Sequence, residues 1–177
     1  SKEFAKEFML RHNIPTAAFR AFGREQVKEA IEHIGRMKAP YVIKADGLAQ
    51  GKGVVIARDA KEAERTVKDM LQGTRFGVAS DRVVIEQFLS GIELSAFLIT
   101  DGEAFKMLPA AKDSKRIGDK DTGPNTGGMG AVSPAPFADK DFMQKVHDRI
   151  AAPTIRGLRA ENIPYQGFLF MGIMNVD

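Results

Sequence analysis

Four stretches of the chain space their apolar side chains three or four residues apart, as an amphipathic helix does. In the first of them, Phe4, Phe8 and Met9 fall on one helical face, so we expect that face to be buried. The expected helices are 2–12, 24–34, 60–72 and 139–150, the second ending at Gly35 and the last kinked or restarted at Pro153.

Runs of β-branched and aromatic residues between these helices predict strands. Residues 93–99 alternate apolar and polar side chains, as a half-buried strand does, whereas 167–174 is almost continuously apolar and predicts a buried strand. The expected strands are 16–22, 41–43, 54–57, 83–89, 93–99, 103–109 and 167–174. Strands and helices alternate in the first third and an antiparallel segment follows, so the pattern favours an α+β fold rather than one doubly wound parallel sheet.

Two positions around the third expected helix carry end signals. Asp59 followed by Glu62 is an acidic capping box, which predicts the start of the helix. Gly73 follows the last periodic residue, where a helix commonly ends.

Residues 110–133 show neither helical nor strand periodicity. Charged side chains come first, and a segment rich in glycine follows between Gly123 and Gly130. A long irregular loop in a compact domain tends to be functional or disordered. We therefore expect a structureless loop in which residues 113–130 are mobile when no ligand is bound, with a solvated surface connection as the alternative.

The composition excludes several classes of protein. Of 177 residues 44% are apolar and 28% charged, which is the range of a globular protein. The net charge of +3 with no Trp gives no support for nucleic-acid binding. No apolar run approaches the ~20 residues of a membrane span. The absence of Cys fits a reducing compartment, and we expect a cytoplasmic protein without thiolate metal sites.

A loop rich in glycine and lysine joins the two strands 41–43 and 54–57. Glycine lets backbone N–H groups approach an anion closely, and lysine adds a positive charge, so the loop suits phosphate binding. It lacks the spacing of a Walker loop and leads into a strand rather than a helix. An ordinary hairpin with solvated lysines remains the alternative.

Three charged residues stand near the ends of the expected strands. Lys44 precedes the glycine loop, with snorkelling to solvent as the alternative. Glu86 and Glu93 can accept hydrogen bonds from a ribose or an exocyclic amine, or can form ordinary surface ion pairs. No catalytic triad and no His-containing metal motif is present, so catalytic residues remain unassigned and no metal ligand is predicted.

The order of these motifs resembles the ATP-grasp superfamily. The motifs are residues 1–2, 42–47, 51–53 and 85–93. Within that superfamily, the segment from Lys115 to Gly130 is similar to the phosphoribosylamine–glycine ligases of purine biosynthesis. The resemblance covers essentially the whole chain and implies an ATP-grasp fold of two lobes with the nucleotide between them. The implied lobes are 16–89, and 1–15 with 90–177.

By this resemblance, glycine is activated by ATP as an acyl phosphate and then joined to 5-phosphoribosylamine, which yields glycinamide ribonucleotide, ADP and phosphate. The implied nucleotide contacts are Lys2, Lys44, Gly51, Lys52 and Gly53 for phosphates, Glu86, Phe88 and Leu89 for adenine, and Glu93 for ribose. The implied residues for the acceptor substrate are Asp113, Lys115, Arg116, Asn125, Thr126, Gly127, Gly128 and Met129.

We expect the chain to be a piece of a longer polypeptide that is inactive by itself, because the family has a further domain on either side. The family's Mg²⁺ or Mn²⁺ ligands are expected beyond Asp177. Another ATP-grasp ligase, such as a purine-pathway carboxylase, and a nucleotide-binding module without catalysis are the two alternatives.

Overall fold

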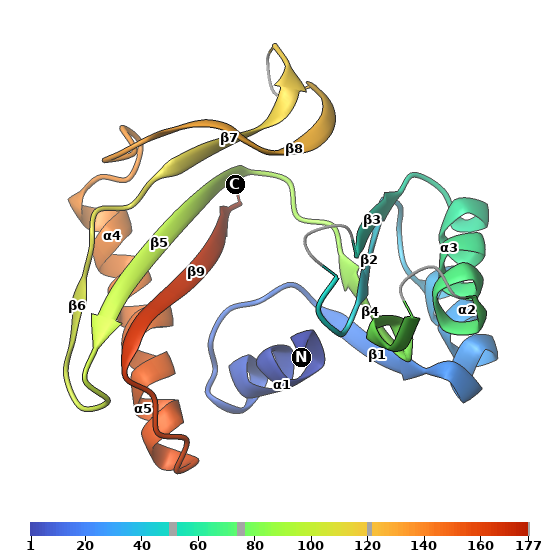
Figure 1. Cartoon of the computed structure of the whole chain (residues 1–177), viewed down its shortest axis with the longest axis horizontal. Helices are drawn as coiled ribbons and strands as arrows, with labels where there is room; N and C mark the ends of the chain where they lie inside the picture. Colours follow the sequence, from blue (N-terminus) through green and yellow to red (C-terminus); the bar gives the residue numbers. More distant parts are fainter. Residues whose placement is uncertain (50–52, 74–76, 120–121, 177) are drawn as a thin grey trace. The chain divides into compact units, whose positions relative to one another are not determined.

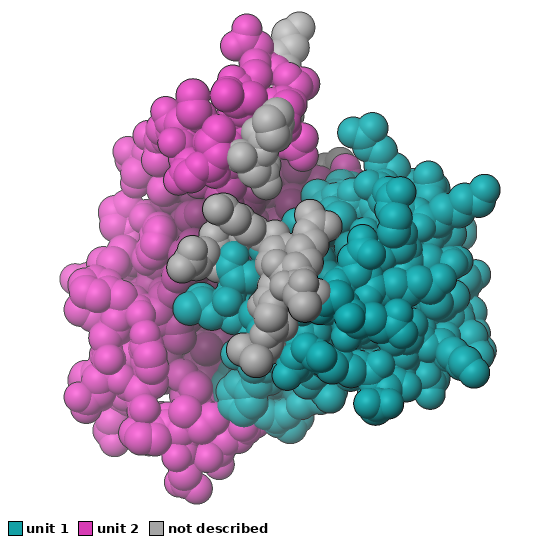
Figure 2. All heavy atoms as spheres, turned by 45° about the vertical axis from the view of Figure 1, so that its right-hand side comes forward, with its two compact units in different colours: residues 1–11, 15–89 teal, residues 12–14, 90–177 magenta. Residues whose placement is uncertain are grey.

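A computed structural model describes residues 1–49, 53–73, 77–119 and 122–176. The chain forms two compact units, Ser1–Arg11 with Pro15–Leu89, and His12–Ile14 with Ser90–Asp177 (Figure 2). The first unit contains the opening helix, which the sequence analysis grouped with the second lobe. The assignment of lobes in a complete protein stays a prediction. No helix in the described ranges is both long enough and apolar enough to cross a membrane.

The first unit is built on a four-stranded sheet in the order β1-β4-β2-β3, and every neighbouring pair is antiparallel. Its strands are β1 Phe19–Gly23, β2 Tyr41–Ala45, β3 Val54–Ala57 and β4 Arg82–Gln87. Its helices are α1 Lys2–Arg11, α2 Val27–Arg36 and α3 Ala60–Gln72, with 3₁₀ turns at Arg24–Gln26 and Gly77–Ser80. Helices α2 and α3 cover one face of the sheet (Figure 1), as expected, and Ile34, Val67 and Ile85 are among the fully buried residues between these layers.

The end signals in the sequence predict the ends of α3 correctly but not the end of α2. The Asp59 carboxylate accepts the Glu62 N–H at 2.8 Å, and Gly73 follows the last residue of α3, so both signals are confirmed. The expectation that Gly35 ends α2 is wrong, because the helix runs to Arg36. Glycine in a helix costs only about 1 kcal/mol relative to alanine. The packing of Ala30 and Ile34 in the core offsets that cost.

The second unit contains a three-stranded antiparallel sheet in the order β6-β5-β9. Its strands are β5 Ile92–Thr100, β6 Phe105–Met107 and β9 Gly167–Asn175. The helices α4 Lys140–Val146 and α5 Ala152–Ala160 lie on one face (Figure 1), where they bury Ala96 and Leu98. The opposite face leaves Phe168 and Phe170 65% and 59% exposed, so the expectation of a fully buried last strand is wrong.

A π-helical turn, His147–Ala151, joins α4 to α5 at the kink expected around Pro153. Proline has no N–H to bond to the carbonyl four residues earlier, and its ring crowds that carbonyl. A widened turn relieves this crowding without ending the helix. The register of the apolar side chains therefore shifts at the turn, while Val146 and Ile155 both stay in the core.

The expectation that residues 110–133 form a structureless loop is wrong. They contain two antiparallel strands, β7 Lys112–Gly118 and β8 Thr122–Val132, drawn as a yellow-to-orange ribbon in Figure 1. The register shifts at Ser114/Arg116 and again at Arg116/Gly118. Most described side chains of the hairpin are exposed or only partly buried, so no apolar alternation was needed to form it. Backbone hydrogen bonds hold it together instead, and these leave no trace in the side-chain pattern.

Candidate functional site

The glycine loop follows β2 in the first unit, as the sequence predicts, and its described ends are tied to the fold. The Lys2 ammonium group donates to the carbonyls of Ala45 at 2.6 Å and Gly47 at 3.0 Å. The Gly47 N–H donates to the Ala79 carbonyl at 2.9 Å. Lys2 therefore lies against the start of the loop. Gly51 and Lys52 lie outside the described residues.

The two described glycines of this loop, Gly47 and Gly53, allow close approaches within the protein. A Cβ at Gly47 would lie 2.7 Å from the Ala79 Cα, and one at Gly53 would lie 2.6 Å from the Ala49 Cβ. Any side chain at these positions would force the neighbouring backbone to move. These two glycines are therefore explained by packing alone, and the case for phosphate binding depends on the lysines.

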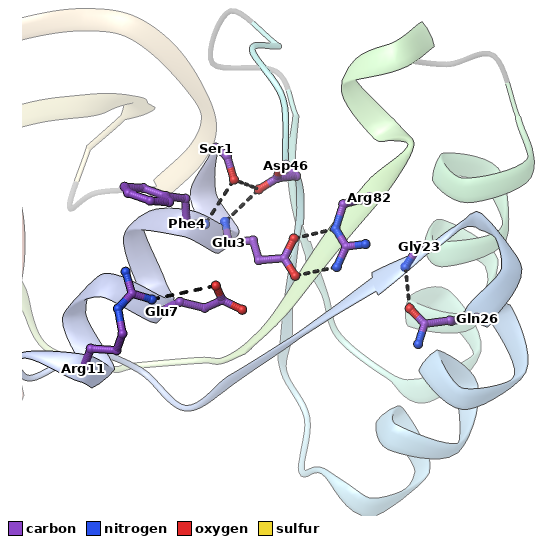
Figure 3. Close-up of polar contacts among 9 residues, drawn as sticks. All are labelled: Ser1, Glu3, Phe4, Glu7, Arg11, Gly23, Gln26, Asp46 and Arg82. Atoms are coloured by element: carbon purple, nitrogen blue, oxygen red, sulfur yellow. Dashed lines mark hydrogen bonds and ion pairs between the residues drawn. The ribbon is translucent and has the colours of Figure 1, made fainter. Parts of the chain in front are cut away.

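Asp46 anchors the first helix to the same loop (Figure 3). Its Oδ1 accepts the Ser1 hydroxyl at 3.0 Å and the Glu3 N–H at 2.7 Å. Ser1 in turn caps the helix through the Phe4 N–H at 3.0 Å, and the Arg82 guanidinium pairs with the Glu3 carboxylate. Burial raises the pKa of Asp46, but the hydrogen bonds from Glu3 and Ser1 outweigh burial, and the pKa lies below its usual 3.8. The ionised carboxylate is the form that this anchor requires.

Asp46→Asn should remove part of the acid sensitivity of the fold. Because the folded-state pKa of Asp46 is lowered, its stabilising contribution is present above 3.8 and is lost as the pH falls through the folded-state value. Urea unfolding between about pH 5 and pH 2 should show a smaller loss of free energy in Asp46→Asn than in the natural chain. Asp141→Asn, at an exposed position of α4, is the matched control. Equal losses in the natural chain and Asp46→Asn would contradict the anchor.

A buried ionic cluster joins α1, β2 and β4. Glu86, on β4, is 6% exposed and sits between two ammonium groups. Its Oε2 is 3.0 Å from the Lys6 Nζ, and its Oε1 is 2.8 Å from the Lys44 Nζ. The register pairs Lys44 with Val84, next but one to Glu86 on β4, so both side chains project from the same face of the sheet. The cluster carries one surplus positive charge, which suits an anionic ligand.

The Glu86 Oε1 atom is close to Lys44 but has no hydrogen bond of acceptable geometry among the described residues. The two observations are compatible, because Coulomb attraction depends on distance and a hydrogen bond also requires alignment. The ion pair therefore contributes to the stability of the cluster even without a hydrogen bond to Oε1. The open lone pairs of Oε1 show that this carboxylate has capacity for a further donor.

Lys6 was missed by the sequence analysis. Its side chain is 9% exposed, whereas Phe4, expected on the buried face of the same helix, is exposed. Phe8 of the expected face is buried, so the apolar spacing is confirmed in part, and the ion pair with Glu86 adds Lys6 to the inward face in place of Phe4. A lysine four residues after Lys2 and two before Phe8 was the available signal, but it cannot be told from an ordinary surface lysine without the position of Glu86.

The second unit brings together several residues expected to bind different ligands. Lys115 on β7 lies 2.5 Å from the Glu93 carboxylate on β5 and 4.0 Å from the Asp113 carboxylate. The Thr126 hydroxyl donates to the Lys115 carbonyl at 2.8 Å and accepts the Gly128 N–H at 3.1 Å. Glu93, which was expected to bind the ribose, is thus paired with Lys115, which was expected to bind the acceptor substrate.

The remaining expected site residues lie just after β4 or on the strands β7 and β8. Phe88 and Leu89 follow β4 directly after Gln87. The Arg116 guanidinium donates to the Gly123 carbonyl at 3.3 Å. On β8, Gly127 has open space around it, Met129 is exposed, and the side chain of Asn125 lies outside the described atoms. Among the described residues, no three His, Asp or Glu side chains come together to hold a metal ion.

The architecture is that of an ATP-grasp domain, the class of the family model that matches residues 1–177. Its structural relatives include a D-alanine–D-alanine ligase from Bacillus anthracis, with a TM-score of 0.68 at 16% identity over 99% of this chain and 52% of that one. At this identity the likeness concerns the fold alone. Together with the antiparallel sheets, it confirms the α+β class.

The chain belongs, over residues 1–177, to the family described as phosphoribosylglycinamide synthetase, ATP-grasp (A) domain. It is similar to phosphoribosylamine–glycine ligases from Vibrio vulnificus, at 50% identity, and Escherichia coli K12, at 51%. Each match covers 174 residues, which is 98% of this chain and 40% of the relative. A solved phosphoribosylamine–glycine ligase from Thermotoga maritima matches with a TM-score of 0.90 at 39% identity, over the whole of this chain and 44% of that one. The chain thus spans about 40% of the length of these curated relatives.

Proposed function

We propose that the chain is the ATP-grasp part of a longer ligase that joins glycine to 5-phosphoribosylamine, with hydrolysis of ATP to ADP and phosphate. The observation that carries the proposal is the identity of about half of all residues with curated relatives of that name, across 98% of this chain. The relatives are much longer, so the complete activity is proposed for the longer protein. A cytoplasmic location is part of the same proposal.

The charged groups of the first unit fit an adenine nucleotide. Phosphoryl transfer depends mainly on positioning and on neutralising phosphate charge. The surplus positive charge around Lys44 is proposed to supply this neutralisation. Lys2 is proposed to add its charge by turning from one of the three loop carbonyls that it binds, those of Ala45, Asp46 and Gly47. The open Oε1 of Glu86 is proposed to accept the exocyclic amine of adenine. A divalent cation would add further charge, but its ligands are expected outside the described residues, so no step is derived through it.

The second unit is proposed to contact the ribose and the acceptor substrate. Glu93 is an acceptor for ribose hydroxyl groups, and Lys115 and Arg116 are cations for the phosphate of 5-phosphoribosylamine. Thr126 and the backbone of Gly127 and Gly128 present polar groups on the adjacent strand β8. The ion pair between Glu93 and Lys115 must open or rearrange for both residues to meet these ligands.

The test is the release of ADP by the longer protein when glycine and 5-phosphoribosylamine are supplied together. Release that depends on both substrates supports the proposal. Release with another carboxylate instead of glycine would indicate a different ATP-grasp ligase, and ATP binding without any release would indicate a module without catalysis. The 177-residue chain is the control and is expected not to turn over, because it spans only about 40% of the relatives' length.

Glu93→Ala in the longer protein should raise the KM for ATP by about 10- to 150-fold, the equivalent of one lost hydrogen bond to a charged group. The discrimination between ATP and 2′-deoxy-ATP should fall at the same time. Lys115→Met is the matched control, because it breaks the same ion pair from the other side and should leave that discrimination intact. An unchanged KM and a natural preference for ATP over 2′-deoxy-ATP in Glu93→Ala would contradict the ribose contact.

A further inference from the structure

Lys6 and Lys44 both contact Glu86, but they differ in how many of their N–H donors have an acceptor within the protein. Lys6 has three acceptors within the first unit, Glu86 Oε2 at 3.0 Å, the Thr16 hydroxyl at 2.8 Å and the Ala17 carbonyl at 3.3 Å. An ammonium group has three N–H donors, so Lys6 has none left for a ligand. Its ammonium group also lies 5.5 Å from the centre of the Phe19 ring. All three N–H donors of Lys6 are thus used in contacts within the protein.

Lys44 has fewer acceptors for its ammonium group than Lys6 and is more exposed. Its side chain is 27% exposed, against 9% for Lys6. Among the described residues, its ammonium group has one partner, Glu86 Oε1 at 2.8 Å, and that contact lacks hydrogen-bond geometry. Lys44 therefore has donors available for a ligand while it is still held near the buried carboxylate.

If Glu86 had no other partner, moving the Lys44 ammonium group from Glu86 to a ligand would cost much free energy. A buried carboxylate without a counter-ion is strongly unfavourable, because the interior does not replace its hydration. Lys6 removes this obstacle, since its own contact with Oε2 does not involve Lys44. Burial lowers the pKa of Lys6, and the attraction of Glu86 opposes that change only in part, so Lys6 depends on Glu86 to keep its charge.

We propose that Lys6 is a positioning residue, the permanent counter-ion of Glu86 that leaves Lys44 free to move from Glu86 to the phosphates of a bound nucleotide. This inference rests on the proposed function, because it takes ATP as the ligand of Lys44. Without Lys6, Lys44 is the one remaining partner of the buried carboxylate and is retained there. Lys6 thus acts on phosphate affinity through Lys44 and touches no ligand itself.

The test is Lys6→Met in the longer protein, with ATP and adenosine as probes. The affinity for ATP should fall at least tenfold, while the affinity for adenosine, which has no phosphate, should change less than threefold. Calorimetry serves for ATP and NMR titration for the weaker adenosine. If Lys6 had only a structural role, the affinities for ATP and adenosine would fall to the same extent. The ratio of the two affinities is therefore the decisive quantity. Lys6→Arg, which keeps the positive charge, should restore most of the ratio.

Two further variants keep the test decisive. Lys6→Gln retains a donor for Glu86 but no charge, and it should reproduce the loss if Lys6→Met does not fold. Lys28→Met changes an exposed lysine on α2 and should leave both affinities unchanged. A folded Lys6→Met or Lys6→Gln with the natural ratio of affinities would overturn the inference alone. Failure of the natural protein to bind ATP would overturn the proposed function and this inference with it.

Discussion

Gly91→Ala should destabilise the chain by about 3 kcal/mol or more, at the upper end of what overpacking usually costs. A Cβ at this position would lie 2.0 Å from the carbonyl oxygen of Asn175 and 2.8 Å from its carbonyl carbon. Both are backbone atoms at the end of β9, where Asn175 pairs with Ile92 on β5. The clash cannot be relieved by a side-chain rotation, so the end of the β5–β9 pair must separate.

Urea unfolding followed by circular dichroism measures this loss, and the chain contains a matched control. Gly35→Ala makes the same chemical change in α2, where nothing lies within 4 Å of the new methyl group. It should stabilise the helix by about 0.5–1 kcal/mol, because glycine loses more backbone freedom on folding than alanine. If Gly91→Ala were no less stable than Gly35→Ala, the close approach of Gly91 to β9 would be refuted.

Glu86→Leu should cost about 3–5 kcal/mol of stability, the usual effect of removing one partner from a buried ion pair. The change leaves Lys6 buried next to Lys44 with no carboxylate between them. Thr16 and Ala17 still accept hydrogen bonds from Lys6, but neither carries a negative charge. The buried Lys6 ammonium group then has no negative charge beside it, and the neighbouring Lys44, which is partly exposed, repels it.

The double variant Lys6→Met with Glu86→Leu separates the buried charge from the loss of packing. Replacing a whole buried pair by apolar side chains is often nearly neutral. The double variant should therefore recover most of the stability that Glu86→Leu loses, again by urea unfolding. If the double variant were less stable than Glu86→Leu alone, the buried charge would not be the cause of the loss.

Elements whose cause is local were predictable from the sequence. The capping box at Asp59 and the loop that joins β2 to β3 depend on neighbours a few residues away. The family also follows from the order of short motifs, and the match over residues 1–177 confirms it. The hairpin of β7 and β8 was not predictable, because its exposed side chains show no period and its backbone bonds leave no mark on the sequence.

The sequence by itself determined the order of most helices and strands, the α+β class and the family, because apolar spacing, caps and motifs are all properties of short segments. Only the tertiary structure decided that Lys6 rather than Phe4 turns inward on α1, and that Glu86 lies between two lysines. These contacts join α1, β2 and β4, which are far apart along the chain. A buried charge selects its partner by distance in the folded protein, and no local pattern carries that distance.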